Sequence, residues 1–206
     1  GGATLNRSSI VNNHGTTVGG IYSDHGAIVL NDSEVSGNVG RGILTGTGTS
    51  IITLNRSSVS NNTLSVTSGS SQDGGGIFVL AGVVRANAST IRGNSAPGNG
   101  GGIAAGEIEL SDSSVSDNSA GGNGGGVSAV VVTMLNSTIS GNIAGKNGGG
   151  VYGGFGPTIV QSTISGNSAG LLGGGVFGVV DPSVRHSTIT GNSAGVAGGG
   201  VFANGA

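Results

Sequence analysis

The sequence predicts an all-β fold, a right-handed parallel β-helix (β-solenoid) of about eight coils of roughly 24 residues, with three short strands per coil. Three observations lead to this prediction: a repeat that fills the whole chain, apolar residues two apart within each repeat, and Gly at recurring places. No segment shows the apolar period of an amphipathic helix. Strands this short are buried only when each pairs with its equivalents in neighbouring coils, at about 4.8 Å per coil.

Each repeat contains a block in which Ser precedes an Ile or Val by two residues and Asn follows that residue by three. The Ser column comprises Ser8, Ser33, Ser57, Ser89, Ser113, Ser137, Ser162 and Ser187. The Asn column comprises Asn13, Asn38, Asn62, Asn94, Asn118, Asn142, Asn167 and Asn192. We expect the Ser hydroxyls to satisfy backbone groups at one corner of the coil and the Asn amides to stack in a ladder along another.

Two further apolar columns complete the repeat. One follows two or three Gly residues and comprises Ile21, Ile43, Ile77, Ile103, Val127, Val151, Val176 and Val201. The other lies five residues before the Ile or Val of the Ser block and comprises Leu5, Leu30, Leu54, Ala86, Leu110, Met134, Ile159 and Val184. The Gly runs predict tight turns where a Cβ would collide with the next coil.

Residues 1–206 are predicted to form a single β-helix domain, with an insertion loop at about 63–73 and a shorter one at 45–50. No capping segment is recognisable at either end. Open end coils favour either a segment of a longer rod or head-to-tail stacking of copies into a filament.

The Gly-Gly-Gly-Val/Ile motif and the Ser-Thr-Ile-Ser-Gly-Asn motif at 137–142 and 162–167 resemble the repeats of right-handed β-helix passenger domains. Polymorphic outer membrane proteins and related bacterial autotransporter adhesins are the family concerned. The resemblance covers essentially the whole chain. It implies an extracellular or cell-surface location and an adhesive rod.

The charge content excludes several partners. The chain has 7 basic and 9 acidic residues and a net charge of -2, which provides no field to hold nucleic acid or an anionic membrane. It has no apolar run long enough for a transmembrane helix. It has no Cys, which excludes disulfides and thiolate metal sites and is compatible with export.

The few charged residues predict ion pairs between coils rather than a catalytic cluster. Glycosidase or lyase chemistry requires carboxylates that converge on one face. Glu109 instead shares a ladder with Arg85 of the previous coil, and Asp32 stands in one column between Arg7 and Arg56. We therefore predict no catalytic residue.

The His residues do not form a recognisable site either. His14, His25 and His186 occupy different columns. Asp24 precedes His25 directly, and adjacent strand residues are expected to point to opposite faces. No metal site and no cofactor is predicted.

Two outward columns are candidate partner surfaces. The residue after each Gly-run Ile or Val is often aromatic, and we expect this column to be exposed unless a loop covers it: Tyr22, Phe78, Tyr152, Phe177 and Phe202. Such a strip suits lateral association or stacking of sugars. The second surface is an array of hydroxyls that is similar to the Thr ladders of β-solenoid antifreeze proteins: Ser114, Ser116, Thr138, Ser140, Thr163, Ser165, Thr188 and Thr190.

Taken together, the sequence favours a non-enzymatic extracellular structural or adhesive rod. Its expected partners are copies of itself, axially or through the aromatic column, and a host surface or glycan. A carbohydrate-binding or polysaccharide-degrading protein is one alternative, and an ice-binding β-solenoid is another.

Overall fold

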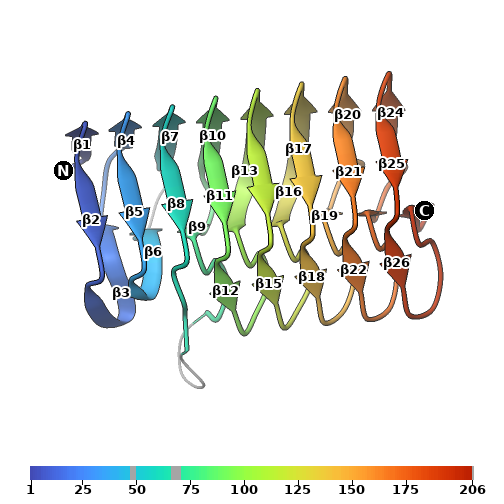
Figure 1. Ribbon diagram of the computed structural model, residues 1–206, viewed down its shortest axis with the longest axis horizontal. Helices are drawn as coiled ribbons and strands as arrows, with labels where there is room; N and C mark the ends of the chain where they lie inside the picture. The colour runs from blue at the N-terminus through green and yellow to red at the C-terminus, as the bar shows by residue number, and fades with distance from the viewer. Residues whose placement is uncertain (47–49, 66–70, 206) are drawn as a thin grey trace.

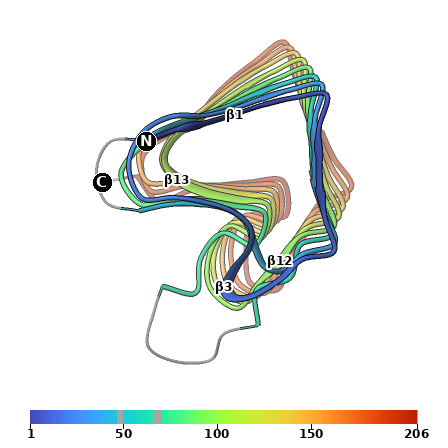
Figure 2. The same cartoon turned by 90° about the vertical axis from the view of Figure 1, so that its left-hand side faces the viewer.

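A computed structural model of the chain describes residues 1–46, 50–65 and 71–205, which form a rod of eight stacked coils (Figure 1). The described residues contain strands and turns and no helix. Seen from its N-terminal end, the chain winds clockwise as it recedes from the viewer (Figure 2), so the coil is right-handed. All strand pairs are parallel, and the predicted fold class is confirmed.

The first of three sheets contains the Ser block and has one strand from each coil. Its strands are β2 (Ser9–Val11), β5 (Glu34–Ser36), β8 (Ser58–Ser60), β11 (Thr90–Arg92), β14 (Ser114–Ser116), β17 (Thr138–Ser140), β21 (Thr163–Ser165) and β25 (Thr188–Thr190). The central Ile or Val of each strand pairs with its equivalent in the next coil, as Val115 does with Ile139. Because side chains alternate along a strand, this residue enters the core while the residues on either side of it point outward.

The second sheet has fourteen strands and joins the other two apolar columns. The strands of the Leu column are β1 (Ala3–Asn6), β4 (Ile28–Asn31), β7 (Ile51–Asn55), β10 (Val83–Asn87), β20 (Thr158–Val160) and β24 (Ser183–Arg185). Those of the Gly-run column are β3 (His14–Ser23), β6 (Val39–Thr45), β9 (Ile77–Val79), β19 (Val151–Gly153), β23 (Val176–Gly178) and β27 (Val201–Ala203). Both columns are contained in β13 (Ile103–Ser111) and β16 (Val127–Leu135), which connect them into one sheet.

A third sheet adds a fourth strand to coils in which three were expected. Its strands have two residues each: β12 (Ser95–Ala96), β15 (Ser119–Ala120), β18 (Ile143–Ala144), β22 (Ser168–Ala169) and β26 (Ser193–Ala194). The Ala of each is turned inward, and Ala120 is only 3% exposed. Two residues are too few to show a period of two, so this strand has no recognisable sequence pattern.

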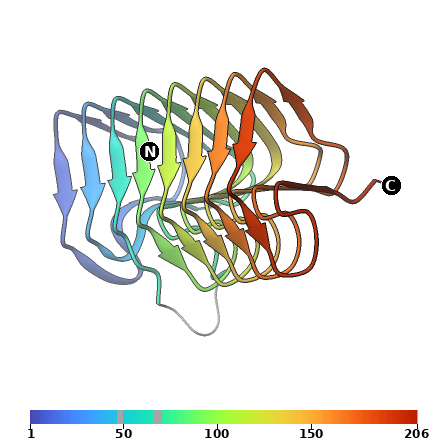
Figure 3. The same ribbon diagram turned by 45° about the vertical axis from the view of Figure 1, so that its right-hand side comes forward.

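The core is a stack of Ile, Val and Leu side chains along the rod axis. In the inner coils these side chains are fully buried, as at Leu54, Ile108 and Ile164, because each coil covers the next. In the end coils Leu5 and Ile189 are only half-buried. Figure 3 shows the stacked coils obliquely, with equivalent strands of all three sheets side by side.

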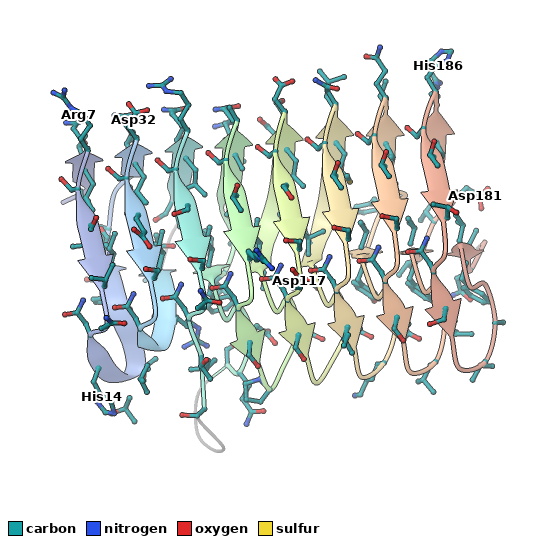
Figure 4. All side chains as sticks on the ribbon, viewed as in Figure 1. Arg7, His14, Asp32, Asp117, Asp181 and His186 are labelled. Atoms are coloured by element: carbon teal, nitrogen blue, oxygen red, sulfur yellow. The ribbon has the colours of Figure 1, made fainter. Side chains whose placement is uncertain are left out.

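The residue before each Ser of the Ser block has a left-handed backbone with φ between 47° and 51°. These residues are Arg7, Asp32, Arg56, Ala88, Asp112, Asn136, Gln161 and His186. None is Gly, although the left-handed region costs an ordinary residue about 1–2 kcal/mol. This corner forms one long edge of the rod, from which Arg7, Asp32 and His186 project (Figure 4).

The two predicted insertions fall partly on residues 47–49 and 66–70, which lie outside the described residues. The flanks of the longer insertion belong to the coil. Thr63 bridges to both Val39 and Ser95, and Leu64 is buried at 2% exposure.

Candidate functional site

The Asn column forms a continuous hydrogen-bonded ladder inside the rod. Asn118 donates to the side-chain oxygen Oδ1 of Asn142 through its backbone N–H and through Nδ2, both at 2.9 Å. Asn142 in turn donates through Nδ2 to the backbone oxygen of Val115 at 3.0 Å and to Asn167 at 2.9 Å. The same contacts join the column from Asn13 to Asn192.

The Ser column forms a second ladder at the neighbouring corner. Ser89 accepts the backbone N–H of Ser57 at 3.1 Å and donates its hydroxyl to the backbone oxygen of Asn87 at 2.7 Å. Equivalent bonds run from Ser8 to Ser187. The polar atoms of both ladders bind the chain's own backbone and, in the Asn column, the next Asn side chain, so these columns hold the coils together.

The structure contains two further polar ladders that were not predicted from the sequence. On an outer corner, Asn31, Asn55 and Asn87 each donate to the Asn of the preceding coil at 2.8–3.0 Å, beginning at Asn6. The signal was present, because these Asn residues stand two places before the Ser column. Near the Gly runs, the side chains of Asp73, Asn99, Asn123 and Asn147 each accept a backbone N–H from the next coil.

Two of the predicted ion pairs between coils are confirmed, whereas Arg7, which the structure also describes, forms no ion pair with Asp32. Arg56 binds both carboxylate oxygens of Asp32, at 2.7 and 2.8 Å, and these bonds hold the pKa of Asp32 below its ordinary value. Arg85 binds Glu109 at 2.8 Å.

A third ion pair, Arg92 with Asp117 at 3.0 Å, was not expected. Arg92 is in register with Ser116, so its acidic partner stands one residue farther along the next coil. A diagonal contact of this kind is not visible in a column alignment.

The expectation that Asp24 and His25 point apart is wrong. His25 Nδ1 lies 2.9 Å from Asp24 Oδ2, with both side chains exposed. Alternation requires an extended strand, and these residues follow β3 in a bend. His14 and His186 lie at opposite ends of the rod (Figure 4), and no group of three potential metal ligands occurs within residues 1–46, 50–65 and 71–205.

The aromatic column, which was expected to be exposed unless a loop covers it, is exposed only in part. Its members are in register through all eight coils, but Tyr22 is 58% exposed whereas Phe177 is only 6% exposed. Phe177 is stacked between Tyr152, with ring centres 5.2 Å apart, and Phe202, at 5.5 Å. The outline of the coil turns inward between the lobe with β3 and β12 and the corner at β13 (Figure 2), so this outward column lines a concave face.

The concave face contains an open hollow of about 370 Å³. Its floor follows the aromatic column through Phe78, Ala104, Ser128 and Tyr152, and Leu80 and Val130 belong to its rim. Leu80 and Val130 are 64% and 49% exposed. The hollow therefore combines an exposed apolar rim with aromatic rings, as interaction surfaces commonly do.

Arg41 is a fully buried cation that the sequence did not single out. Its guanidinium donates to the backbone oxygens of Asp73 at 2.8 Å, Thr17 at 3.4 Å and Ser71. It also lies 5.0 Å from the centre of the Phe78 ring, a cation–π arrangement. Burial lowers the pKa of Arg41. Arg41 thus ties the flank of the longer insertion to the second coil and supports Phe78.

The hydroxyl array is in register over the last four coils. On the outer side of the first sheet, Ser114, Thr138, Thr163 and Thr188 form one row and Ser116, Ser140, Ser165 and Thr190 a second. The rows are parallel to the rod axis.

No protein family, no curated protein and no solved structure matches this chain. The described residues include no helix long and apolar enough to cross a membrane. The fold and its surfaces are therefore the basis for any functional conclusion.

Proposed function

We propose that the chain is a non-enzymatic structural rod that works outside the cell, as the shaft of a surface adhesin or a matrix filament. The observation that carries this proposal is the unbroken Asn ladder, which joins all eight coils from Asn13 to Asn192. Continuous ladders resist bending and local opening, because each coil is bonded to both neighbours. The resemblance of the repeats to autotransporter adhesin passengers supports an extracellular setting.

The arrangement of the carboxylates favours a structural role over catalysis. Asp32, Glu109 and Asp117 each bind an Arg of a neighbouring coil. General acid–base catalysis uses carboxylates that converge on a substrate with pKa values set apart. Carboxylates bound by guanidinium groups at separate places along a rod do not meet this requirement.

Association between copies is part of the proposal. The outermost strands of the second sheet are β1 and β24 in the Leu column and β3 and β27 in the Gly-run column, and each pairs on one side only within the described residues. A second copy could add a parallel strand there, which is the open head-to-tail geometry of a filament. Sedimentation velocity over a hundredfold range of concentration tests this step, and a sharp monomer throughout contradicts it.

The adhesive role is tested with fluorescent beads that carry the purified chain. We expect the beads to attach to cell monolayers or to plates coated with extracellular matrix, and we expect no release of reducing ends when the chain is incubated with soluble polysaccharides. Beads that carry heat-unfolded chain are the control. Release of reducing ends without attachment would replace the structural proposal by an enzymatic one.

A second candidate function is ice binding, and the two hydroxyl rows favour it. Rows in register, such as Thr138, Thr163 and Thr188, repeat at the coil spacing of about 4.8 Å. Thermal hysteresis of the purified chain tests this candidate. A Thr163→Lys variant should abolish hysteresis, whereas Gln161→Lys, at an exposed corner, should leave it unchanged.

A further inference from the structure

We propose that the hollow between Phe78 and Tyr152 binds the end of a neutral carbohydrate chain. This inference rests on the proposed adhesive function and deepens it, because it names the partner class and the place of contact. The hollow measures about 370 Å³, within the range of sites for small ligands of about 300–1,000 Å³.

Two aromatic rings close the hollow at its two ends along the rod axis. The ring of Tyr152 is parallel to that of Phe177 within 3°, and Phe177 belongs to the next coil on the C-terminal side. The uncovered face of Tyr152 is therefore turned toward Ser128, on the N-terminal side. At the other end, Arg41 covers Phe78 from the preceding coil and leaves the opposite face turned toward Ala104.

The space between these rings exists because the aromatic column has small residues, instead of aromatic ones, in two successive coils. Ala104 and Ser128 occupy the positions where Phe78 and Tyr152 stand in the flanking coils. The two rings are three coil steps apart, about 14 Å at the β-sheet spacing. From Tyr152 onward the column is filled by stacked rings, so the gap is confined to this part of the rod.

The polar groups of the hollow select the class of ligand. Among the described residues, the hydroxyl of Ser128 has no side-chain hydrogen-bond partner, and Asn99 borders the same space. Of the lining residues that the structure describes, Asp73 alone is charged, and its carboxylate would repel a phosphate, a sulfate or an acidic sugar. A neutral sugar fits both features of the hollow. The apolar face of its ring can stack on Phe78 or Tyr152, and the hydroxyls at its edge can bind Ser128 and Asn99.

The site is also held in shape before any ligand arrives. Phe177 supports Tyr152, Arg41 supports Phe78, and the Arg41 guanidinium is itself fixed by three backbone oxygens. Rings that are already ordered lose little side-chain entropy when a ligand stacks on them.

Tyrosine fluorescence provides a direct test, because the chain has two Tyr residues and no Trp. In a Tyr22→Phe background, Tyr152 is the one remaining Tyr, so the tyrosine fluorescence comes from the proposed site. Lactose, cellobiose, N,N′-diacetylchitobiose and mannobiose are titrated separately, with calorimetry in parallel and 3′-sialyllactose as the acidic counterpart of lactose. We expect saturable quenching by at least one neutral disaccharide.

Three variants locate the binding. Ser128→Phe fills the gap with a further ring and should abolish binding while the unfolding midpoint is retained. Tyr152→Ala should weaken binding about tenfold, and Tyr152→Phe, followed by calorimetry, should preserve it. The proposal is overturned if none of the four neutral disaccharides binds at millimolar concentration, if 3′-sialyllactose binds as tightly as they do, or if Ser128→Phe binds as the parent does.

The bead assay separates this inference from the function on which it rests. If Ser128→Phe beads attach as the parent beads do and no disaccharide binds, the adhesive rod is supported and the carbohydrate site is contradicted. Saturable disaccharide binding that Ser128→Phe abolishes, without attachment of beads, supports the site and contradicts the adhesive rod.

Discussion

Asn142 Oδ1 accepts two hydrogen bonds from Asn118, one from the backbone N–H and one from the side-chain amide, both at 2.9 Å. One side chain thereby satisfies a buried backbone donor of the preceding coil and continues the amide ladder. Both residues are at most 1% exposed, so water cannot replace either bond. This relationship links the sequence repeat to the stability of the rod.

We expect Asn142→Ala to lower the free energy of unfolding by about 3 kcal/mol, because it leaves a buried N–H of Asn118 and the buried oxygen of Val115 without partners. Urea unfolding followed by circular dichroism measures this. Asn13→Ala, in the exposed first coil, is the matched control and should lower it by only about 1 kcal/mol. Equal losses of unfolding free energy in the two variants would show that the buried hydrogen bonds stabilise the rod no more than the exposed ones.

Two Gly residues precede the Ile or Val of the Gly-run column in most coils, and the second of them can be compared between an inner coil and the last coil. A Cβ on Gly126 would lie 2.7 Å from the backbone oxygen of Gly150 in the next coil, whereas a Cβ on Gly200 meets only Ile189, at 3.5 Å. We expect Gly126→Ala to destabilise the rod by about 2–3 kcal/mol and Gly200→Ala to change stability by less than about 0.5 kcal/mol. Thermal unfolding of the two variants checks the order, and a tolerated Gly126→Ala contradicts the close approach of coils.

Arg41→Ala should destabilise the second and third coils by about 3 kcal/mol, because three backbone oxygens lose their donor. Hydrogen exchange should become faster at residues 71–77 in particular. Arg56→Ala removes an exposed Arg of the same region and should leave exchange there unchanged. A uniform increase in exchange along the whole rod would argue against a local anchoring role.

Phe177→Ala should lower stability by about 3–4 kcal/mol, since it removes a buried ring from between two others. Tyr22 stands in the same column but is 58% exposed, and Tyr22→Ala should have little effect. Chemical denaturation distinguishes the two cases. Similar effects at both positions would mean that the concave face does not bury its aromatic residues.

The pair Asp32–Arg56 predicts a pH effect. Its hydrogen bonds lower the pKa of Asp32 in the folded chain, so the stabilisation is present above the unfolded pKa of about 3.9 and is lost as pH falls through the folded value. Carboxyl NMR titration should give Asp32 a pKa below that of an unperturbed Asp, and Arg56→Ala should raise it toward the unfolded value. An unchanged Asp32 pKa in that variant contradicts the assignment.

Several features of the fold were predictable because a parallel β-helix places equivalent residues on top of one another. The columns of Ser33, Asn38 and Ile43 and the pair Arg85–Glu109 follow from the repeat alone. The two-residue strands could not be predicted, because Ser119–Ala120 is too short to show alternation. The Arg92–Asp117 pair was missed because it crosses from one column to the next.

The sequence by itself determined the coil, its register and the side of each strand on which a residue lies, because all three depend on local period. Only the tertiary structure decided which outward side chains are covered, because the curvature of the coil depends on how its sheets pack. The inward turn of the outline buries Phe177, encloses Arg41 and forms the hollow between Phe78 and Tyr152. Alternation assigns an outward direction to Phe78, Tyr152 and Phe177, but it contains no information on whether the surface there is convex or concave.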